Sequence, residues 1–221
     1  MNIPTTEELF DLSHTLARDL LEKTRFPFEA LMKIKEFSEI LGEKLKARGY
    51  ERYKENVWIS KNAKIHPSAI IEGPAVIGHE TELRPGAFIR GSVIIGDGAV
   101  IGNSTEIKNA IIFDNVQIPH YNYVGDSILG YKSHMGAGAI ASNFKLDHSN
   151  VKIRDGEEAY ETGLRKLGVM LGDFSEIGCG CVLNPGTVIG KHTAVYPLTY
   201  VRGIIPENSI VKNNGEIIKR K

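Results

Sequence analysis

An interval of six residues separates large apolar side chains over much of the chain. From residue 59 to residue 113 every sixth residue is aliphatic or aromatic, namely Ile59, Ile65, Ile71, Ile77, Leu83, Ile89, Ile95, Ile101, Ile107 and Phe113. The residue two positions earlier is mostly small, such as Ala63 or Ala75. This period matches neither an amphipathic helix, which repeats about every 3.6 residues, nor a half-buried strand, which alternates. It predicts a coil of three short faces with one inward aliphatic side chain per face.

The repeat continues, with one shift of phase and one interruption, as far as Pro206. The phase shifts near Pro119, and the pattern resumes at Val124, Leu129, Met135 and Ala141. Residues 142–167 do not repeat, and the period returns at Leu171. We therefore predict a mainly β protein with a parallel β-helix over residues 57–206, an inserted loop at 142–167 and a C-terminal tail at 207–221. Insertions of this kind project from a solenoid and commonly carry binding residues.

Residues 1–56 have helical periodicity instead. Thr5 and Glu8 form a capping-box pattern, and leucines at helical spacing follow at Leu9, Leu12, Leu16 and Leu20. A second apolar stripe runs between residues 28 and 48, with Gly49 as a helix stop, and comprises Leu31, Ile34, Phe37, Leu41 and Leu45. We predict two amphipathic helices in an N-terminal segment that caps the coil or docks a partner.

Charge and cysteine content exclude several classes of function. Lys plus Arg and Asp plus Glu both number 27, so no net positive field attracts nucleic acid or an anionic membrane. No targeting signal and no apolar run of about 18 residues is present, which favours the cytoplasm. Cys179 and Cys181 alternate along one strand, so we expect no disulfide between them. The seven histidines share no recurring offset, and we expect no metal site.

Candidate chemistry lies where the repeat breaks. The segment QIPHYNYVGD, residues 117–126, places His120 among aromatic and amide side chains, where it could act as a general base or be an ordinary surface histidine. With about 18 residues per coil, Arg84 and Lys108 lie upstream of it, so that both cations could share one outer face and bind a phosphate. Otherwise they are solvated side chains. The turn Gly136–Gly138 would allow a ligand to approach the backbone closely.

These motifs, RPGA at 84–87, EIK at 106–108, HYNYVGDSILG at 120–130 and GAGAIASNF at 136–144, resemble the hexapeptide-repeat acetyltransferase superfamily. The similarity is closer to the acetyltransferase domain of bifunctional N-acetylglucosamine-1-phosphate uridylyltransferases and archaeal sugar-1-phosphate nucleotidylyltransferase/acetyltransferases, and it covers residues 60–205. The resemblance implies a left-handed β-helix, a homotrimer with active sites between subunits, and transfer of acetyl from acetyl-CoA to the amine of a hexosamine 1-phosphate.

The resemblance also implies a role for individual residues. His120 would be the general base, and the phosphate and sugar of the acceptor would be bound by Arg84, Lys108, Tyr123 and Asn143. The CoA channel would be lined by Ala137, Cys179 and Pro197. Backbone N–H groups of the Gly136–Gly138 turn would stabilise the negative charge on the thioester oxygen. Direct transfer requires neither a metal nor a cysteine nucleophile.

The sequence also departs from the family pattern. The helical segment stands where the relatives have a nucleotidyltransferase domain, and the chain has no phosphate loop of that domain, so nucleotidyl transfer is not expected. Phe144 replaces a tyrosine and Ser149 a lysine, for which Lys145 or Lys152 could substitute. We predict an acetyl-CoA-dependent N-acetyltransferase for an amino-sugar 1-phosphate.

Two alternatives belong to other functional classes. The first is a non-catalytic trimeric module that binds a sugar nucleotide or CoA and partners a separate nucleotidyltransferase. The second is a γ-type carbonic anhydrase on the same scaffold. It would need three metal-binding histidines shared across a subunit interface, and the close histidine pair that normally supplies two of them is absent from this sequence.

Overall fold

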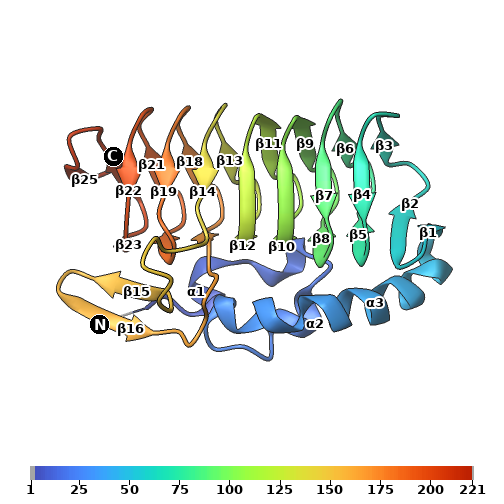
Figure 1. The fold of residues 1–221 in the computed structure, drawn as a ribbon, viewed down its shortest axis with the longest axis horizontal. Helices are drawn as coiled ribbons and strands as arrows, with labels where there is room; N and C mark the ends of the chain where they lie inside the picture. The colour runs from blue at the N-terminus through green and yellow to red at the C-terminus, as the bar shows by residue number, and fades with distance from the viewer. Residues whose placement is uncertain (1–2, 221) are drawn as a thin grey trace.

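Strands of successive coils pair in parallel along a β-solenoid with three faces (Figure 1). The computed structural model describes residues 3–220. The first face contains β2 (Val57–Ser60), β5 (Ala75–Ile77), β8 (Val93–Ile95), the second halves of β10 (Glu106–Ile112) and β12 (Tyr123–Leu129), β17 (Val169–Leu171), β20 (Thr187–Ile189) and β23 (Ile204–Ile205).

The other two faces follow in chain order within each coil. The second face contains β3 (Lys64–Ile65), β6 (Glu82–Leu83), β9 (Val100–Asn103), β11 (Gln117–His120), β13 (His134–Met135), β18 (Glu176–Ile177), β21 (Ala194–Val195) and β24 (Ser209–Val211). The third face contains β4 (Ile70–Glu72), β7 (Phe88–Arg90), the first halves of β10 and β12, β14 (Ile140–Ala141), β19 (Val182–Leu183) and β22 (Tyr200–Val201).

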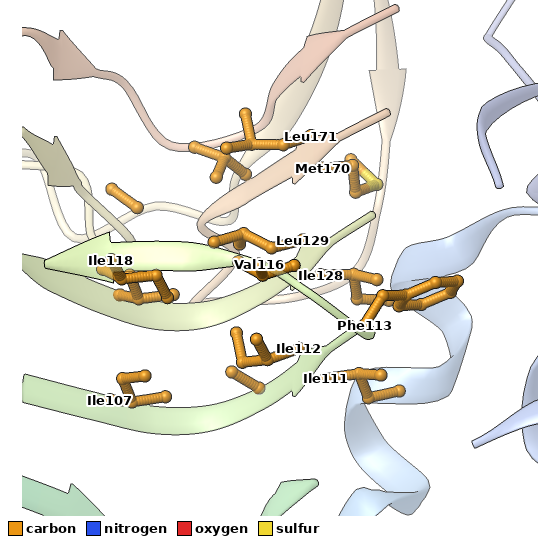
Figure 2. Packing of buried hydrophobic residues seen from close by; sticks show 14 of the residues in the cluster. Ile107, Ile111, Ile112, Phe113, Val116, Ile118, Ile128, Leu129, Met170 and Leu171 are labelled. Carbon is orange, nitrogen blue, oxygen red and sulfur yellow. The ribbon is translucent and has the colours of Figure 1, made fainter. Parts of the chain in front are cut away.

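The inward aliphatic side chains stack in ladders, as the period of six predicted, with one correction. Ile77 pairs with Ile95, 18 residues later, but Ile95 pairs with Ile112, 17 residues later. The coil therefore shortens before Phe113, earlier than the sequence indicated, and Ile112 takes the inward position. Phe113 points outward (Figure 2). It packs against Phe10, with ring centroids 5.0 Å apart. Each fully buried aliphatic side chain stabilises the fold by roughly 1.5–3 kcal/mol.

The first face is apolar on its outer side as well, and the N-terminal segment covers it. Its outward side chains are fully buried and comprise Val76, Ile94, Ile111, Ile128 and Met170. Figure 2 shows Ile111, Ile128 and Met170 pointing toward the N-terminal helices rather than into the coil. We call residues 3–49 the strap, because they run beside the first face along most of its length (Figure 1).

The strap contains more breaks than the sequence predicted. Its elements are α1 (Thr6–Leu9), η1 (Leu12–His14), α2 (Arg18–Leu21), η2 (Pro27–Lys33), α3 (Ile34–Leu45) and η3 (Lys46–Arg48). The capping box at Thr5 and Glu8 is present, but the single helix expected after it is wrong. Phe10 leaves the helix in extended geometry to reach Phe113. Gly49 ends the last turn in left-handed geometry, with φ 85°, as expected.

Gly42 of α3 receives the indole ring of Trp58, at the first coil. Ser38 and Gly42, one helical turn apart, are buried. A β-carbon at Gly42 would lie 2.1 Å from Cδ2 of Trp58, so only glycine leaves room for the ring. Trp58 is 1% exposed and packs in a cluster with Leu45, Tyr50 and Val76. This contact fixes α3 against the start of the solenoid.

The other end of the strap is held by carboxylates at the corner between the first and second faces. The backbone N–H of Asp11 donates to Oδ2 of Asp173 at 2.7 Å, and that of Asp114 donates to the His14 carbonyl at 3.0 Å. The imidazole of His14 stacks on Tyr131, with centroids 3.7 Å apart, and lies 4.0 Å from Oδ2 of Asp114. The strap thus contacts both early and late coils.

Burial raises the pKa of the Asp114 carboxyl above its ordinary value of 3.8. An acid whose pKa is raised on folding destabilises the folded state at pH values at which the acid is ionised. This penalty disappears as the pH falls through the raised pKa. Asp114→Asn keeps the oxygen that accepts from the Asp97 N–H. Urea titrations would measure the free energy of unfolding of the variant minus that of wild type. We expect this difference to be more positive at about pH 7 than at about pH 4. A gap that widens toward acid would contradict this assignment.

The solenoid continues beyond the boundary predicted at Pro206. Strand β24 pairs in parallel with β21, and β25 (Ile217–Lys219) then turns back antiparallel to β24. At the opposite end, β1 (Tyr50–Lys54) lies antiparallel to β2, so a hairpin covers one sheet edge at each end. The insertion carries its own hairpin, β15 (Lys152–Asp155) and β16 (Glu158–Glu161), outside the stack (Figure 1). None of the helices within residues 3–220 is long and apolar enough to cross a membrane.

Candidate active site

Four of the predicted site residues lie in one row along the corner between the second and third faces. Each stands two residues after an inward side chain of the second face, and those inward residues pair in register from coil to coil. The row consists of His120, Ala137, Cys179 and Pro197, all exposed. Their carbonyls accept in sequence: His120 from Gly138 N at 3.0 Å, Ala137 from Gly180 N at 2.8 Å, and Cys179 from Leu198 N at 2.9 Å. We call these residues the His120 row.

His120 ends strand β11, and its backbone is fixed by a residue that the sequence did not single out. The His120 N–H donates to Oδ1 of Asn122 at 3.1 Å, while Nδ2 of Asn122 donates to the carbonyls of Gly136 and Ala139. Asn122 is 3% exposed and so ties the histidine to the turn of the following coil. The imidazole itself has no hydrogen-bond partner among residues 3–220. Its ring nitrogens remain available to a substrate.

The Gly136–Gly138 turn offers fewer free N–H groups than predicted. Gly136 N donates to the Ile177 carbonyl at 2.7 Å and Gly138 N to the His120 carbonyl at 3.0 Å, so both groups are used by the coil-to-coil ladder. The N–H of Ala137 has no acceptor within the described part of the chain. Of the N–H groups of this turn, which were expected to bind a developing oxyanion, only that of Ala137 remains free within residues 3–220.

A second group of predicted residues converges on Asp126 at the corner between the third and first faces. Oδ2 of Asp126 lies 2.5 Å from Nδ2 of Asn143 and 3.5 Å from Nζ of Lys108, and Oδ1 accepts from Nδ2 of Asn109 at 2.8 Å. The same Asn143 nitrogen is 3.1 Å from the Tyr123 hydroxyl. We call these five residues the Asp126 cluster. It brings together three of the four predicted acceptor ligands.

Local backbone geometry explains the residue types in this cluster. Asn109 and Asp126 adopt φ of 48° and 49°, and asparagine and aspartate tolerate this left-handed conformation better than other side chains. A β-carbon at Gly125 would lie 2.5 Å from both Nδ2 of Asn143 and the Tyr123 hydroxyl, so glycine lets these groups cross the strand. Burial raises the pKa of the Tyr123 phenol, which keeps its hydroxyl protonated at neutral pH.

The predicted common face for Arg84 and Lys108 is not found. Arg84 follows β6 of the second face and pairs with Glu82, Nε to Oε1, at 3.3 Å, whereas Lys108 lies on the third-face half of β10. The register of β7 and β10 places Arg90 beside Lys108 instead, one coil earlier. Arg90 pairs with Glu106 at 2.6 Å. Its spacing of 18 residues before Lys108 was the signal that could have identified it.

The two groups occupy opposite edges of the third face. His120 precedes the third-face half of β12, and Asp126 follows it. Tyr123 and Asp126 are three positions apart, and three steps along an extended chain span about 10 Å. Within one chain, therefore, the third face separates the His120 row from the Asp126 cluster.

A hollow of about 540 Å³ lies beside the cluster, between the insertion and the third face. Its lining includes Phe144, Lys145, Lys152, Arg154 and Arg202. Lys145 pairs with Asp147 at 3.1 Å, and Lys152 pairs with Glu161. Both lysines that could substitute for the one replaced by Ser149 thus line the same hollow, next to Asn143.

The two cysteines are free, as expected. Cys179 is exposed in the His120 row, whereas Cys181 points inward, where burial raises the pKa of its thiol. Its Sγ donates to the Tyr196 carbonyl at 3.1 Å. Within residues 3–220 no three His, Cys, Asp or Glu side chains converge to hold a metal ion.

Comparison with known proteins relates this fold and these motifs to acetyltransferases. A family model described as the GMPPB C-terminal domain matches residues 71–158. The bifunctional protein GlmU of Methanococcus aeolicus is 34% identical over 76% of this chain and 46% of its own length. The putative uncharacterized acetyltransferase YaiX of Escherichia coli is 36% identical over 68% of this chain and 65% of its own.

A solved structure of PerB from Caulobacter crescentus, in complex with CoA and GDP-perosamine, is 19% identical with a TM-score of 0.37, over 83% of this chain and 66% of that one. The chain spans less than half the length of the Methanococcus relative. In its six-residue repeat, in the solenoid that this repeat forms and in its relatives by sequence, the chain resembles the hexapeptide-repeat acetyltransferases.

Proposed function

We propose that the protein is an acetyl-CoA-dependent N-acetyltransferase acting on an amino-sugar 1-phosphate such as glucosamine 1-phosphate, without nucleotidyltransferase activity. The observation that carries this proposal is the alignment of His120 with Ala137, Cys179 and Pro197 on successive coils. The extended pantetheine chain of acetyl-CoA would lie along this row, with its thioester beside the imidazole of His120. Similarity to GlmU and to a bifunctional sugar-1-phosphate nucleotidylyltransferase/acetyltransferase of Sulfurisphaera tokodaii, 34% identical over 63% of this chain and 38% of its own length, supports the same class of reaction.

The proposed chemistry needs only a base and an oxyanion donor. The acceptor amine attacks the thioester carbonyl carbon, His120 removes the proton from nitrogen, the C–S bond breaks, and the CoA sulfur leaves and takes up a proton. The free N–H of Ala137 would donate to the carbonyl oxygen as negative charge develops there. One such donor is worth about 10² to 10³ in rate. No metal takes part.

The Asp126 cluster would bind the sugar and its phosphate. Lys108 and, beside it, Arg90 replace the predicted pair of Lys108 and Arg84 as phosphate ligands, although each cation already has a carboxylate partner. Tyr123 and Asn143 would contact sugar hydroxyls. Further cations in the hollow beside the insertion, of which Arg154 and Arg202 are examples, suit other phosphoryl groups of the two substrates.

We infer that the complete site forms between copies of the chain in a homotrimer of left-handed β-helices. The His120 row and the Asp126 cluster of one chain are separated by the third face, so a neighbouring copy is needed to bring them to one substrate. The outer side of the third face carries exposed apolar residues that suit such a contact, namely Ile70, Val182 and Tyr200. The first face is already covered by the strap.

Thiol release from acetyl-CoA tests the proposal, with glucosamine 1-phosphate, galactosamine 1-phosphate, glucosamine and no acceptor in parallel. Release that requires an amino-sugar phosphate is the expected result and identifies the acceptor. Binding of CoA without release for any acceptor would favour the non-catalytic binding module instead. Metal analysis of the same preparation tests the γ-type carbonic anhydrase alternative.

A further inference from the structure

We propose that Asp126 is a positioning residue that determines which atoms of the acceptor site donate hydrogen bonds to the sugar phosphate and which accept them. The inference rests on the proposed function and concerns which atoms the site presents to the sugar phosphate. Asp126 is 5% exposed, and its carboxylate lies beneath Asn143, Lys108 and Asn109 rather than at the surface. It therefore acts through its neighbours.

Hydrogen bonds connect the buried Asp126 carboxylate through Asn143 to the Tyr123 hydroxyl. A carboxylate only accepts hydrogen bonds, so the atom of Asn143 that lies 2.5 Å from Oδ2 must be the amide nitrogen. The second hydrogen of that NH₂ group points to the Tyr123 hydroxyl, 3.1 Å away, which becomes the acceptor. The amide orientation of Asn143 is thus fixed by Asp126.

The ligand would contact the atoms of Tyr123 and Asn143 that these hydrogen bonds leave free. The Tyr123 hydroxyl accepts from Asn143, so its own hydrogen is free to donate to an oxygen of the acceptor. Oδ1 of Asn143 has no protein partner within residues 3–220, so it is free to accept from a sugar hydroxyl or amine. The carboxylate also holds the Lys108 ammonium, 3.5 Å away, over the same edge. The site therefore presents a donor, an acceptor and a cation in fixed positions.

Asp126→Asn tests the inference because it preserves shape and removes the obligatory acceptor. Two facing amides can pair in either direction, so Tyr123 is no longer constrained to donate to the ligand. We expect the KM for the amino-sugar phosphate to rise about 10- to 100-fold, the usual effect of losing a hydrogen bond to a charged group. We expect an unchanged KM for acetyl-CoA and little change in kcat.

A double-mutant cycle with Tyr123→Phe distinguishes positioning from general loosening. Tyr123→Phe should raise the acceptor KM in the wild-type background but add little in the Asp126→Asn background. The matched control is Asp97→Asn, a corner carboxylate that accepts a backbone N–H from His79 at 2.7 Å, remote from the cluster. It should leave both KM values unchanged. Multiplicative effects in the cycle, or a wild-type acceptor KM for Asp126→Asn, would overturn the inference.

Failure of the proposed function is separable from failure of this inference. If the wild-type protein releases no thiol with any amino-sugar phosphate, calorimetric binding of glucosamine 1-phosphate replaces KM in the same cycle. Binding weakened by Asp126→Asn, with no further loss from Tyr123→Phe, supports the positioning role in a non-catalytic module. Absence of any binding to the wild type would overturn both.

Discussion

The His120→Ala variant is expected to transfer acetyl groups about 10² to 10⁴ times more slowly than the wild-type protein, the usual contribution of a positioned general base. The imidazole is exposed and has no hydrogen-bond partner among residues 3–220, so its removal should leave the thermal midpoint within about 1–2 °C of wild type. Binding of CoA should persist, because Ala137, Cys179 and Pro197 are untouched. A rate that falls while stability and CoA binding hold would identify His120 as the base.

His66→Ala is the matched control for this variant. His66 is also an exposed histidine of the solenoid, in an early coil away from the His120 row, and within residues 3–220 its ring hydrogen-bonds only to Ser68. It should retain full activity. Wild-type turnover by His120→Ala would contradict the proposed mechanism at its centre.

The Gly42→Ala variant is expected to lower the free energy of unfolding by about 1–3 kcal/mol, the common penalty for overpacking a core. The added methyl group would lie 2.1 Å from Cδ2 and 2.2 Å from Cε3 of Trp58. Alanine favours a helix over glycine by about 1 kcal/mol, so any net loss must come from this clash. Urea unfolding followed by tryptophan fluorescence reports on the same indole ring.

A second substitution distinguishes the clash from a simple change of helix propensity. In the double variant Gly42→Ala with Trp58→Leu, the smaller side chain makes room for the methyl group, so the two losses should not add. Lys35→Ala, on the exposed side of α3, is the control and should change stability by less than about 0.5 kcal/mol. A Gly42→Ala variant as stable as wild type would show that α3 is not fixed by Trp58.

The period of six was sufficient to predict the solenoid and its interruption by the insertion, but it ended the solenoid too early, at Pro206, because β24 still pairs in parallel with β21. It located most inward residues because each face tolerates only one large aliphatic side chain toward the axis. It placed the change of coil length too late, since Ile112 and Phe113 are both apolar and only their packing decides which of them points inward. A signal for the covered first face was present but unused: apolar pairs such as Val76–Ile77 and Ile94–Ile95 recur once per coil.

The candidate site could be predicted in its parts but not in its arrangement. Motifs identified His120, Tyr123, Lys108 and Asn143, and register then brought the last three onto Asp126. Spacing separates Arg84 from Lys108 by one coil of about 18 residues and one further face of about six, but it could not show which carboxylate each cation contacts. Nor could it show which N–H groups of the Gly136–Gly138 turn are already used, which depends on the pairing of neighbouring coils.

The strap changes how the molecule can come apart. In an open stack each coil contacts only its neighbours, so end coils can fray while the middle stays folded. Here one continuous segment packs on Trp58 in the first coil and bonds to Asp173 more than a hundred residues later. Loosening either end therefore requires part of the strap to detach, which exposes the apolar outer side of the first face along several coils. Amide hydrogens at the two ends should accordingly exchange with solvent in a single shared opening.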